Sequence, residues 1–237
     1  MTMDEAVRTG APVLLHLDSS ADRSDGSVTR ALGAAYARGW LARHPGAAYR
    51  YRDLTAEPVP LVGEGYVRLG TRVERHGALP LEKVAALAEG ADEEREWAAT
   101  LPLVTEVRAA TTLLVGAPMY NFSVSAALKA WIDRVSFPGA YADPDSGRSL
   151  LAGTWVVVAA ACGGGYGPGT PREGCDFQLP YLRAYFAQLG VAEANLRVVR
   201  AELTRAGDIP ALGRFRELGE RSLAGAREAV AELARSF

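Results

Sequence analysis

The sequence predicts an α/β protein built on a five-stranded, doubly wound parallel sheet with helices on both faces. Short, nearly continuous apolar runs alternate with amphipathic stretches from end to end, as expected when each strand is buried on both faces of a parallel sheet. The length of 237 residues suits one larger α/β domain with a continuous core. No repeat or linker interrupts the pattern, so we expect a single domain spanning 1–237.

Periodicity predicts where each element lies. Strands are expected at 12–18, 47–54, 111–117, 154–160 and 196–201. Helices are expected at 27–43, 81–110 (with Gly90 as a candidate break), 124–135, 177–189 and 211–236. Ligands of such sheets lie beyond the carboxyl ends of the strands. The loops after Leu17, Ala117 and Ala160 are therefore the places to look for a site.

Composition limits the class of partner. The net charge is −2 and no long Lys/Arg run occurs, which argues against a nucleic-acid partner because such a site needs clustered positive charge. Two cysteines and three histidines give neither a disulfide scaffold nor metal-ligand spacing, so no metal site is expected. No apolar stretch approaches membrane length, and no signal-peptide pattern opens the chain. We expect a cytoplasmic enzyme with no membrane partner.

The first loop carries hydroxyl side chains where a helix is expected to begin. Ser20, Ser27 and Thr29, with the backbone amide of Val28, offer donors for a phosphate monoester. The alternative is that Ser27 or Thr29 only caps the helix, as such residues often do. Neither a Walker sequence nor the dinucleotide pattern G-x-G-x-x-G is present in this loop.

The second loop contains two aromatic residues, a methionine and an amide: Pro118, Met119, Tyr120, Asn121 and Phe122. Apolar faces for stacking and an amide for a ring edge suit a flat heteroaromatic ligand. The alternative is that Met119 and Phe122 pack into the core and that Asn121 caps the next helix. The string as a whole fits that alternative less well than its single residues do.

The third loop is rich in glycine and begins with Ala161 and Cys162, followed by Gly163, Gly164 and Gly165. Consecutive glycines let a backbone approach a ligand closely and direct several N–H groups at one oxygen. The alternative is a flexible loop. Cys162 would act as a redox thiol only in an electropositive setting, and His16, inside the first strand, reads as a structural residue.

These features resemble the FMN-dependent NADH-azoreductase family of the flavodoxin-like NAD(P)H:quinone oxidoreductase superfamily. The string 118–122, Leu128-Lys129, the early serines and the Gly163-Gly164 pair carry the resemblance. It implies a flavodoxin-like homodimer with one FMN per subunit. It also implies which residues contact the cofactor. The FMN phosphate would be bound by Ser20, Ser27, Val28 and Thr29, and the ring would lie along Met119, Tyr120, Asn121 and Phe122. The pyrimidine end of the ring would contact Ala161, Cys162, Gly163 and Gly164.

The sequence departs from that family at three places. Ala161-Cys162 stands where the family has Ser-Arg, 137–142 differs from the expected Arg-x-Gly-x-Thr-Phe, and Gln188 stands where an aromatic residue often closes the pocket. FMN binding is compatible with these changes. They bear on the substrate, because a side-chain donor and a positive charge are missing beside the flavin.

The resemblance implies an FMN-dependent oxidoreductase that passes hydride from NADH or NADPH through flavin N5 to a quinone, azo compound or related aromatic acceptor. Tyr120 and Phe122 would shape the acceptor pocket, amides of 163–165 would stabilise the flavin anion, and no protein acid or base is obligatory. Two alternatives stay open: a dedicated biosynthetic flavoenzyme that reduces or isomerises one specialised metabolite, and a non-enzymatic electron carrier like flavodoxin.

Overall fold

Five parallel strands form one sheet in the order β2-β1-β3-β4-β5, which confirms the predicted fold class. The structure is a computed structural model and describes residues 1–77 and 79–236. The strands are β1 (Val13–Asp18), β2 (Ala48–Asp53), β3 (Thr112–Pro118), β4 (Trp155–Ala161) and β5 (Leu196–Ala201). Each end lies within one residue of its predicted position, because buried apolar runs mark strands of a covered parallel sheet strongly.

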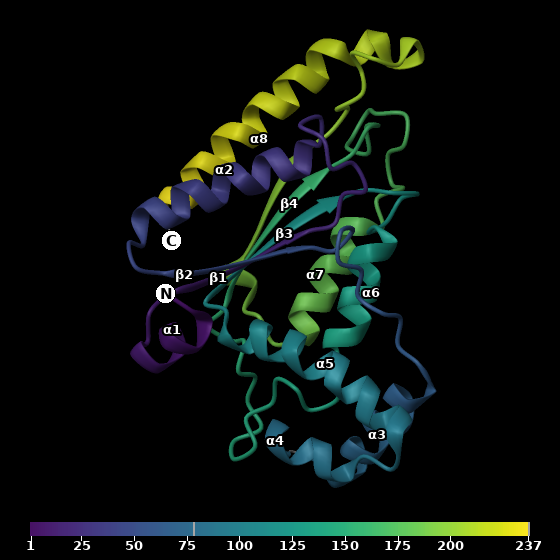
Figure 1. Cartoon of the computed structure of the whole chain (residues 1–237). Helices are drawn as coiled ribbons and strands as arrows, with labels where there is room; N and C mark the ends of the chain where they lie inside the picture. Colours follow the sequence, from purple (N-terminus) through teal and green to yellow (C-terminus); the bar gives the residue numbers. More distant parts are fainter. Residues whose placement is uncertain (78, 237) are drawn as a thin grey trace.

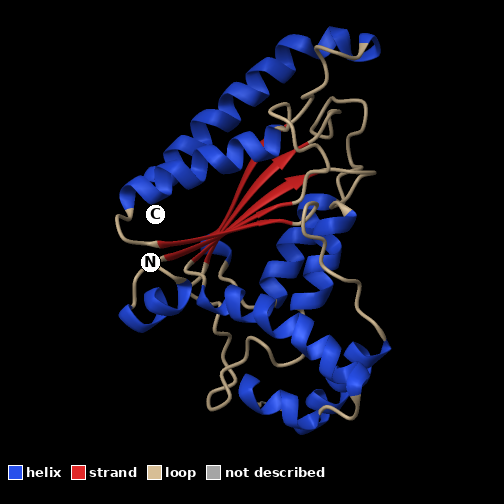
Figure 2. Ribbon diagram, viewed as in Figure 1, coloured by secondary structure: helices blue, strands red, loops and turns tan. Residues whose placement is uncertain are grey.

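Helices cover both faces of the sheet. They are α1 (Met3–Thr9), α2 (Val28–Arg43), α3 (Glu64–His76), α4 (Leu81–Val84), α5 (Ala91–Ala109), α6 (Ala126–Val135), α7 (Gln178–Gln188) and α8 (Arg216–Ser236), with short 3-10 turns at Ala85–Leu87, Glu193–Asn195 and Pro210–Phe215. Helices α2 and α8 lie on one face and α5, α6 and α7 on the other, while α3 and α4 lie beyond α5 (Figures 1 and 2). None of these helices is long and apolar enough to cross a membrane.

Alternate side chains of the central strands fill the two cores. Leu14, Leu114 and Val157 point toward α2 and α8, where they pack with Trp40 and Val230. The intervening positions of the same strands pack against α5, α6 and α7. All residues of β1 and β3 are buried, so the framework that carries the loops at its carboxyl ends is rigid.

The helical prediction was right about one break and wrong elsewhere. The segment expected to be helical over 81–110 is divided at its candidate break, Gly90, whose φ is +96°, but the part before the break is only α4 and a 3-10 turn. The closing helix begins with the 3-10 turn at Pro210 rather than as α-helix. Helices α1 and α3 were not predicted. In α3, a Cβ at Gly65 would lie 3.0 Å from the Asp92 carbonyl carbon, so its glycines reflect close packing on α5 rather than a loop.

Candidate functional site

A cavity of about 860 Å³ opens at the carboxyl ends of the strands. The order of the strands reverses between β1 and β3, so the loops that follow these two strands diverge and leave a crevice there. All the predicted site residues except Cys162 are among the lining residues that the structure describes. Residues from the segment after β5, among them Arg205 and Leu212, complete the wall and were not predicted.

At the end of the loop after β1 (residues 19–27, the serine loop) and at the start of α2, the hydroxyls of Ser27 and Thr29 are available to a ligand. Ser27 occupies the N-cap position of α2, but its side chain makes no capping hydrogen bond; among the described residues its hydroxyl meets only the Thr29 hydroxyl, at 3.5 Å. Ser125 shows the contrast, because its hydroxyl accepts a hydrogen bond from the Leu128 amide and does cap α6. The capping alternative for Ser27 is therefore wrong. Two buried hydroxyls and the unpaired first amides of a helix are groups suited to an anion.

Arg30, in the first turn of α2, links the serine loop to the end of β2. Its guanidinium donates to the carbonyl oxygens of Ser20 (2.8 Å) and Asp22 (3.0 Å) and to both carboxylate oxygens of Asp53 (2.9 and 3.0 Å). Burial acts to raise the pKa of Asp53, but hydrogen bonds from Arg30 and Thr55 outweigh it and keep the pKa well below its usual value. Arg30 was not predicted as a site residue; the one available signal was its position as the third residue of α2, directly after the serine loop.

His16 lies beneath the same loop and away from the cavity. Its Nδ1 is 3.0 Å from the Tyr49 hydroxyl and its Nε2 is 3.6 Å from Asp18. Tyr51 donates to the other Asp18 oxygen at 3.0 Å. Burial, with the charge of Asp18, raises the pKa of Tyr51 to about 12, so this hydroxyl keeps its proton at neutral pH. His16 is a buried packing residue, as its position in the first strand indicated.

The loop after β3 is a tight turn that presents aromatic side chains at the cavity. The Tyr120 and Ser123 backbones exchange hydrogen bonds of 3.0 and 3.1 Å, and Asn121 and Phe122 have φ of +46° and +72°. A positive φ is uncommon for a bulky residue and is concentrated at functional sites. Phe122 is 40% exposed, so the alternative that it fills the core is wrong. Asn121 does not cap α6, because Ser125 does.

Two further contacts set the position of this turn. The Ala21 amide donates to the Tyr120 hydroxyl at 3.0 Å, which links the turn to the serine loop. Gln178, only 1% exposed, donates from its side-chain amide to the Pro118 carbonyl at 2.9 Å. Gln178 was not predicted, since one glutamine at a helix start carries no signal of its own. Together these contacts hold the serine loop, the turn and α7 in a common arrangement.

The loop after β4 (residues 162–169, the glycine loop) is anchored through its carbonyl groups to the segment after β5 and to Arg172. The Leu203 amide donates to Gly164 (2.9 Å) and the Arg172 amide to Gly165 (3.2 Å). The amides of Gly163, Gly164 and Gly165 donate to no acceptor among the described residues. The amides of Tyr166 and Gly167, in contrast, point to the Glu202 carboxylate. Three consecutive unpaired N–H groups therefore remain for a ligand, and the loop is anchored by its carbonyls.

Cys162 lies behind the cavity wall. The residue is 4% exposed and its Sγ is 3.3 Å from the Gly164 carbonyl oxygen. Burial raises the pKa of the thiol to about 11. Because the thiolate is the reactive form, Cys162 is not a redox nucleophile at neutral pH.

Thiol labelling of the native protein tests whether Cys162 is protonated and inaccessible. At pH 8 we expect a disulfide reagent such as Ellman's to modify about one thiol per chain, at partly exposed Cys175, and to reach Cys162 only after unfolding. The Cys175→Ser variant should then show almost no rapid reaction. Rapid release of two equivalents from the native protein would contradict the neutral, inaccessible thiol.

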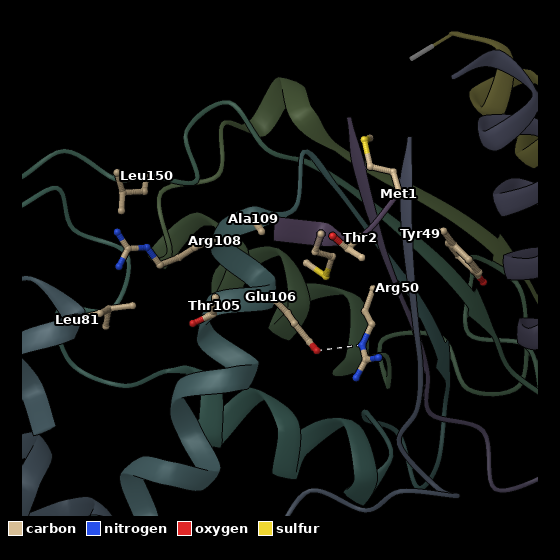
Figure 3. Close-up of a pocket in the computed structure, with 11 residues that line it drawn as sticks. Met1, Thr2, Tyr49, Arg50, Leu81, Thr105, Glu106, Arg108, Ala109 and Leu150 are labelled. Atoms are coloured by element: carbon tan, nitrogen blue, oxygen red, sulfur yellow. Dashed lines mark hydrogen bonds and ion pairs between the residues drawn. The ribbon is translucent and has the colours of Figure 1, made fainter. Parts of the chain in front are cut away.

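A larger cavity, of about 990 Å³, lies at the opposite end of the sheet. Figure 3 shows Met1, Leu81 and Leu150 around it and Arg50 turned toward Glu106. Glu106 also accepts from Arg52, so its charge is compensated. The cavity lies at the amino ends of the strands, away from the crevice where ligands of doubly wound sheets bind, and none of the predicted site residues lines it.

Comparison with known proteins identifies the family to which this chain belongs. Residues 13–213 match the family described as having a flavodoxin-like fold. The chain belongs to this flavodoxin-like family. It is 39% identical over 226 residues, 95% of this chain and 99% of the relative, to a protein of Nocardia farcinica named FMN-dependent NADH:quinone oxidoreductase. A Streptomyces avermitilis protein of the same name is 36% identical over 225 residues, 94% of this chain and 96% of the relative.

Solved structures agree with the flavodoxin-like fold. An azoreductase from Bacillus anthracis superposes with a TM-score of 0.76 at 19% identity, covering 95% of this chain and all of that one. An FMN-dependent NADH-azoreductase from the same species, in complex with FMN, has a TM-score of 0.69 at 18% identity, covering 94% of this chain and 99% of the other. At such identities the likeness concerns the fold. The family match and the Nocardia farcinica and Streptomyces avermitilis relatives confirm the resemblance identified from the sequence motifs.

Proposed function

We propose that this flavodoxin-like protein is an FMN-dependent oxidoreductase that uses NADH to reduce quinones or related conjugated acceptors. The observation that carries the proposal is the uncapped N-terminus of α2, where the hydroxyls of Ser27 and Thr29 lie buried beside free helix amides at the strand-order reversal. Full-length relatives that share more than a third of their residues with this chain bear the name FMN-dependent NADH:quinone oxidoreductase.

The residues present fit FMN along the whole cavity. A volume of about 860 Å³ is within the range for cofactor sites. Hydroxyls and helix amides lie at one end, an aromatic turn in the middle and three free glycine amides on another wall. FMN, when bound, supplies hydride transfer between a nicotinamide and an acceptor, chemistry that no side chain offers.

The chain's own residues would bind FMN, orient its ring and shape the space for the acceptor. Ser20, Ser27, Thr29 and the Val28 amide would hold the phosphate, with Arg30 fixing the loop. Pro118 and Met119 would lie along the ring, and Asn121 would pair with its edge. Tyr120 and Phe122 would shape the space for a flat acceptor. The amides of Gly163, Gly164 and Gly165 would face negative charge at the carbonyl edge of the ring, and Ala161 and Cys162 would contribute backbone only.

Two features favour an enzyme over an electron carrier. The aromatic turn leaves Tyr120 and Phe122 exposed at the mouth, with room for a second flat molecule. Helices α3 and α4 add a further helical layer beyond α5, which a small carrier does not need. We further propose that 1–237 acts as one domain in a homodimer. The cytoplasmic location remains a prediction of the sequence.

Anaerobic spectroscopy tests the proposal. The purified protein, after incubation with FMN and removal of the excess, should show a flavin spectrum that bleaches within seconds of adding NADH and recovers on adding a simple quinone. An unchanged spectrum with NADH would indicate a carrier or another reductant. Rapid bleaching without recovery by a panel of quinones and azo dyes would instead favour an enzyme dedicated to one metabolite. A protein that takes up no FMN would refute the proposal.

A further inference from the structure

An arginine lies on two aromatic rings at the mouth of the cavity. The Arg172 guanidinium carbon is 5.5 Å from the ring centre of Phe122 and 5.8 Å from that of Tyr166. Its Nη1 donates to the Tyr166 hydroxyl at 2.9 Å, and the two rings meet edge to face at 6.2 Å. All three residues line the cavity. Because Arg172 and Phe122 are exposed, the cluster lies where a ligand would enter.

The positive charge of Arg172 has no partner among the described carboxylates, although several lie close by in the fold. Asp176 and Glu202 both pair with Arg200, Asp176 at 2.9 Å. Glu173, the next residue in the chain, accepts a hydrogen bond from the Gly169 amide at 2.8 Å. Arg172 forms no ion pair with any described residue, so its charge remains available to a ligand.

Two arginines lie against the glycine loop, Arg172 at ordinary contact distance from Gly164 and Arg205 in a closer approach to Gly163. A Cβ at Gly164 would lie 3.7 Å from Arg172 Nη1, and a Cβ at Gly163 would lie 3.1 Å from Arg205 Cδ. Arg205 also lines the cavity and has no ion-pair partner among the described residues. Asp208, one turn further along, lines the same wall. It therefore offsets part of the Arg205 charge, whereas Glu173, the carboxylate next to Arg172 in the chain, is not among the residues that line the cavity.

The other lining carboxylate belongs to the opposite end of the cavity. Asp22 is in the serine loop, where it accepts hydrogen bonds from the Ser24 amide (2.9 Å) and hydroxyl (2.6 Å). These bonds hold the pKa of Asp22 below its usual value, so it is ionised at neutral pH. The cavity is thus acidic only beside the serine loop and near Asp208, and its aromatic mouth carries the unpaired charge of Arg172.

We propose that Arg172, seated on Phe122 and Tyr166, makes this site select flat aromatic ligands that carry an anionic substituent such as a carboxylate. Aromatic faces accommodate the planar guanidinium and leave its in-plane N–H groups free, apart from the one that Nη1 donates to Tyr166. A carboxylate on a flat ligand meets those groups in a charge-assisted, geometrically matched pair, while the ring of the ligand stacks beside Phe122. The inference rests on the proposed function, because the ligand is taken to share the cavity with FMN.

Calorimetry on the FMN-loaded protein tests the selectivity without turnover. The probes are 2-naphthoate and 2-naphthamide, which share a ring system and differ in charge. At pH 7.5 we expect wild type to bind the carboxylate about tenfold more tightly than the amide, as for one hydrogen bond to a charged group in a partly desolvated place. The Arg172→Gln variant should bring the two affinities within about twofold of each other. Arg172→Lys should retain most of the preference through its charge.

The matched control is Arg183→Gln, which removes one exposed positive charge from α7, away from the lining of the cavity. It should leave the tenfold ratio unchanged. Equal affinities in wild type, or equal losses in Arg172→Gln and Arg183→Gln, would overturn the selectivity while leaving FMN binding intact. A protein that takes up no FMN would overturn the proposed function and this inference together.

Discussion

Replacing Arg30 by alanine is expected to lower the free energy of unfolding by about 2–3 kcal/mol and to weaken FMN binding at least about tenfold. The guanidinium joins α2 to the end of β2 and to two carbonyls of the serine loop. Its removal leaves the largely buried Asp53 carboxylate with only the exposed Arg23 as a counterion, at 3.3 Å, and without its two-pronged pair. It also releases the loop that would hold the phosphate. Urea unfolding of the apoprotein and titration of flavin fluorescence measure the two effects.

Arg50→Ala is the matched control for Arg30→Ala. Arg50 lies on β2 and pairs with Glu106 at 3.0 Å, but it is 45% exposed and Glu106 keeps Arg52 as a second partner. We expect a loss below about 1 kcal/mol and no change in FMN affinity. Arg30→Lys keeps the charge without the fork and should fall between wild type and alanine. Similar losses from Arg30→Ala and Arg50→Ala would rule out the role given to Arg30.

The double variant Ser27→Ala, Thr29→Val is expected to weaken FMN binding about 100-fold and to change the free energy of unfolding by less than about 0.5 kcal/mol. Each hydroxyl would donate to a charged phosphate, and a hydrogen bond to a charged group contributes about tenfold or more in affinity. Neither hydroxyl bonds to a described backbone group in the absence of a ligand. The same fluorescence titration and urea unfolding report both quantities.

Ser125→Ala is expected to lower stability without changing FMN affinity, the reverse of the double variant. The Ser125 hydroxyl caps α6 through the Leu128 amide at 3.2 Å, so its loss should cost about 1 kcal/mol of stability and leave FMN affinity unchanged. Two serines at N-cap positions are thereby distinguished by function. A double variant at Ser27 and Thr29 that loses stability but keeps its FMN affinity would show that these residues cap the helix rather than bind phosphate.

The helices were predicted less well than the strands, and α3 shows why. Its sequence carries Gly65 and Gly70, residues that disfavour a helix by about 1 kcal/mol each relative to alanine. In the structure, a Cβ at Gly65 would approach the Asp92 backbone and one at Gly70 would lie 3.3 Å from Pro138. Close packing therefore outweighs local propensity. Pro102 inside α5 is likewise tolerated in a helix held by its buried face.

The sequence by itself determined the sheet, the three loops and the residue types that gather at the cavity, because burial on both faces of a strand and glycine or hydroxyl-rich loops are local patterns. Only the tertiary structure decided which side chains are free. Ser27 and Ser125 look alike in sequence, yet one caps its helix and the other does not. Arg30 meets Asp53, and Arg172 meets Phe122, across long stretches of chain. A polar side chain bonds to whichever group the fold brings within hydrogen-bond distance, and the hydrophobic periodicity of the sequence does not predict which group that is.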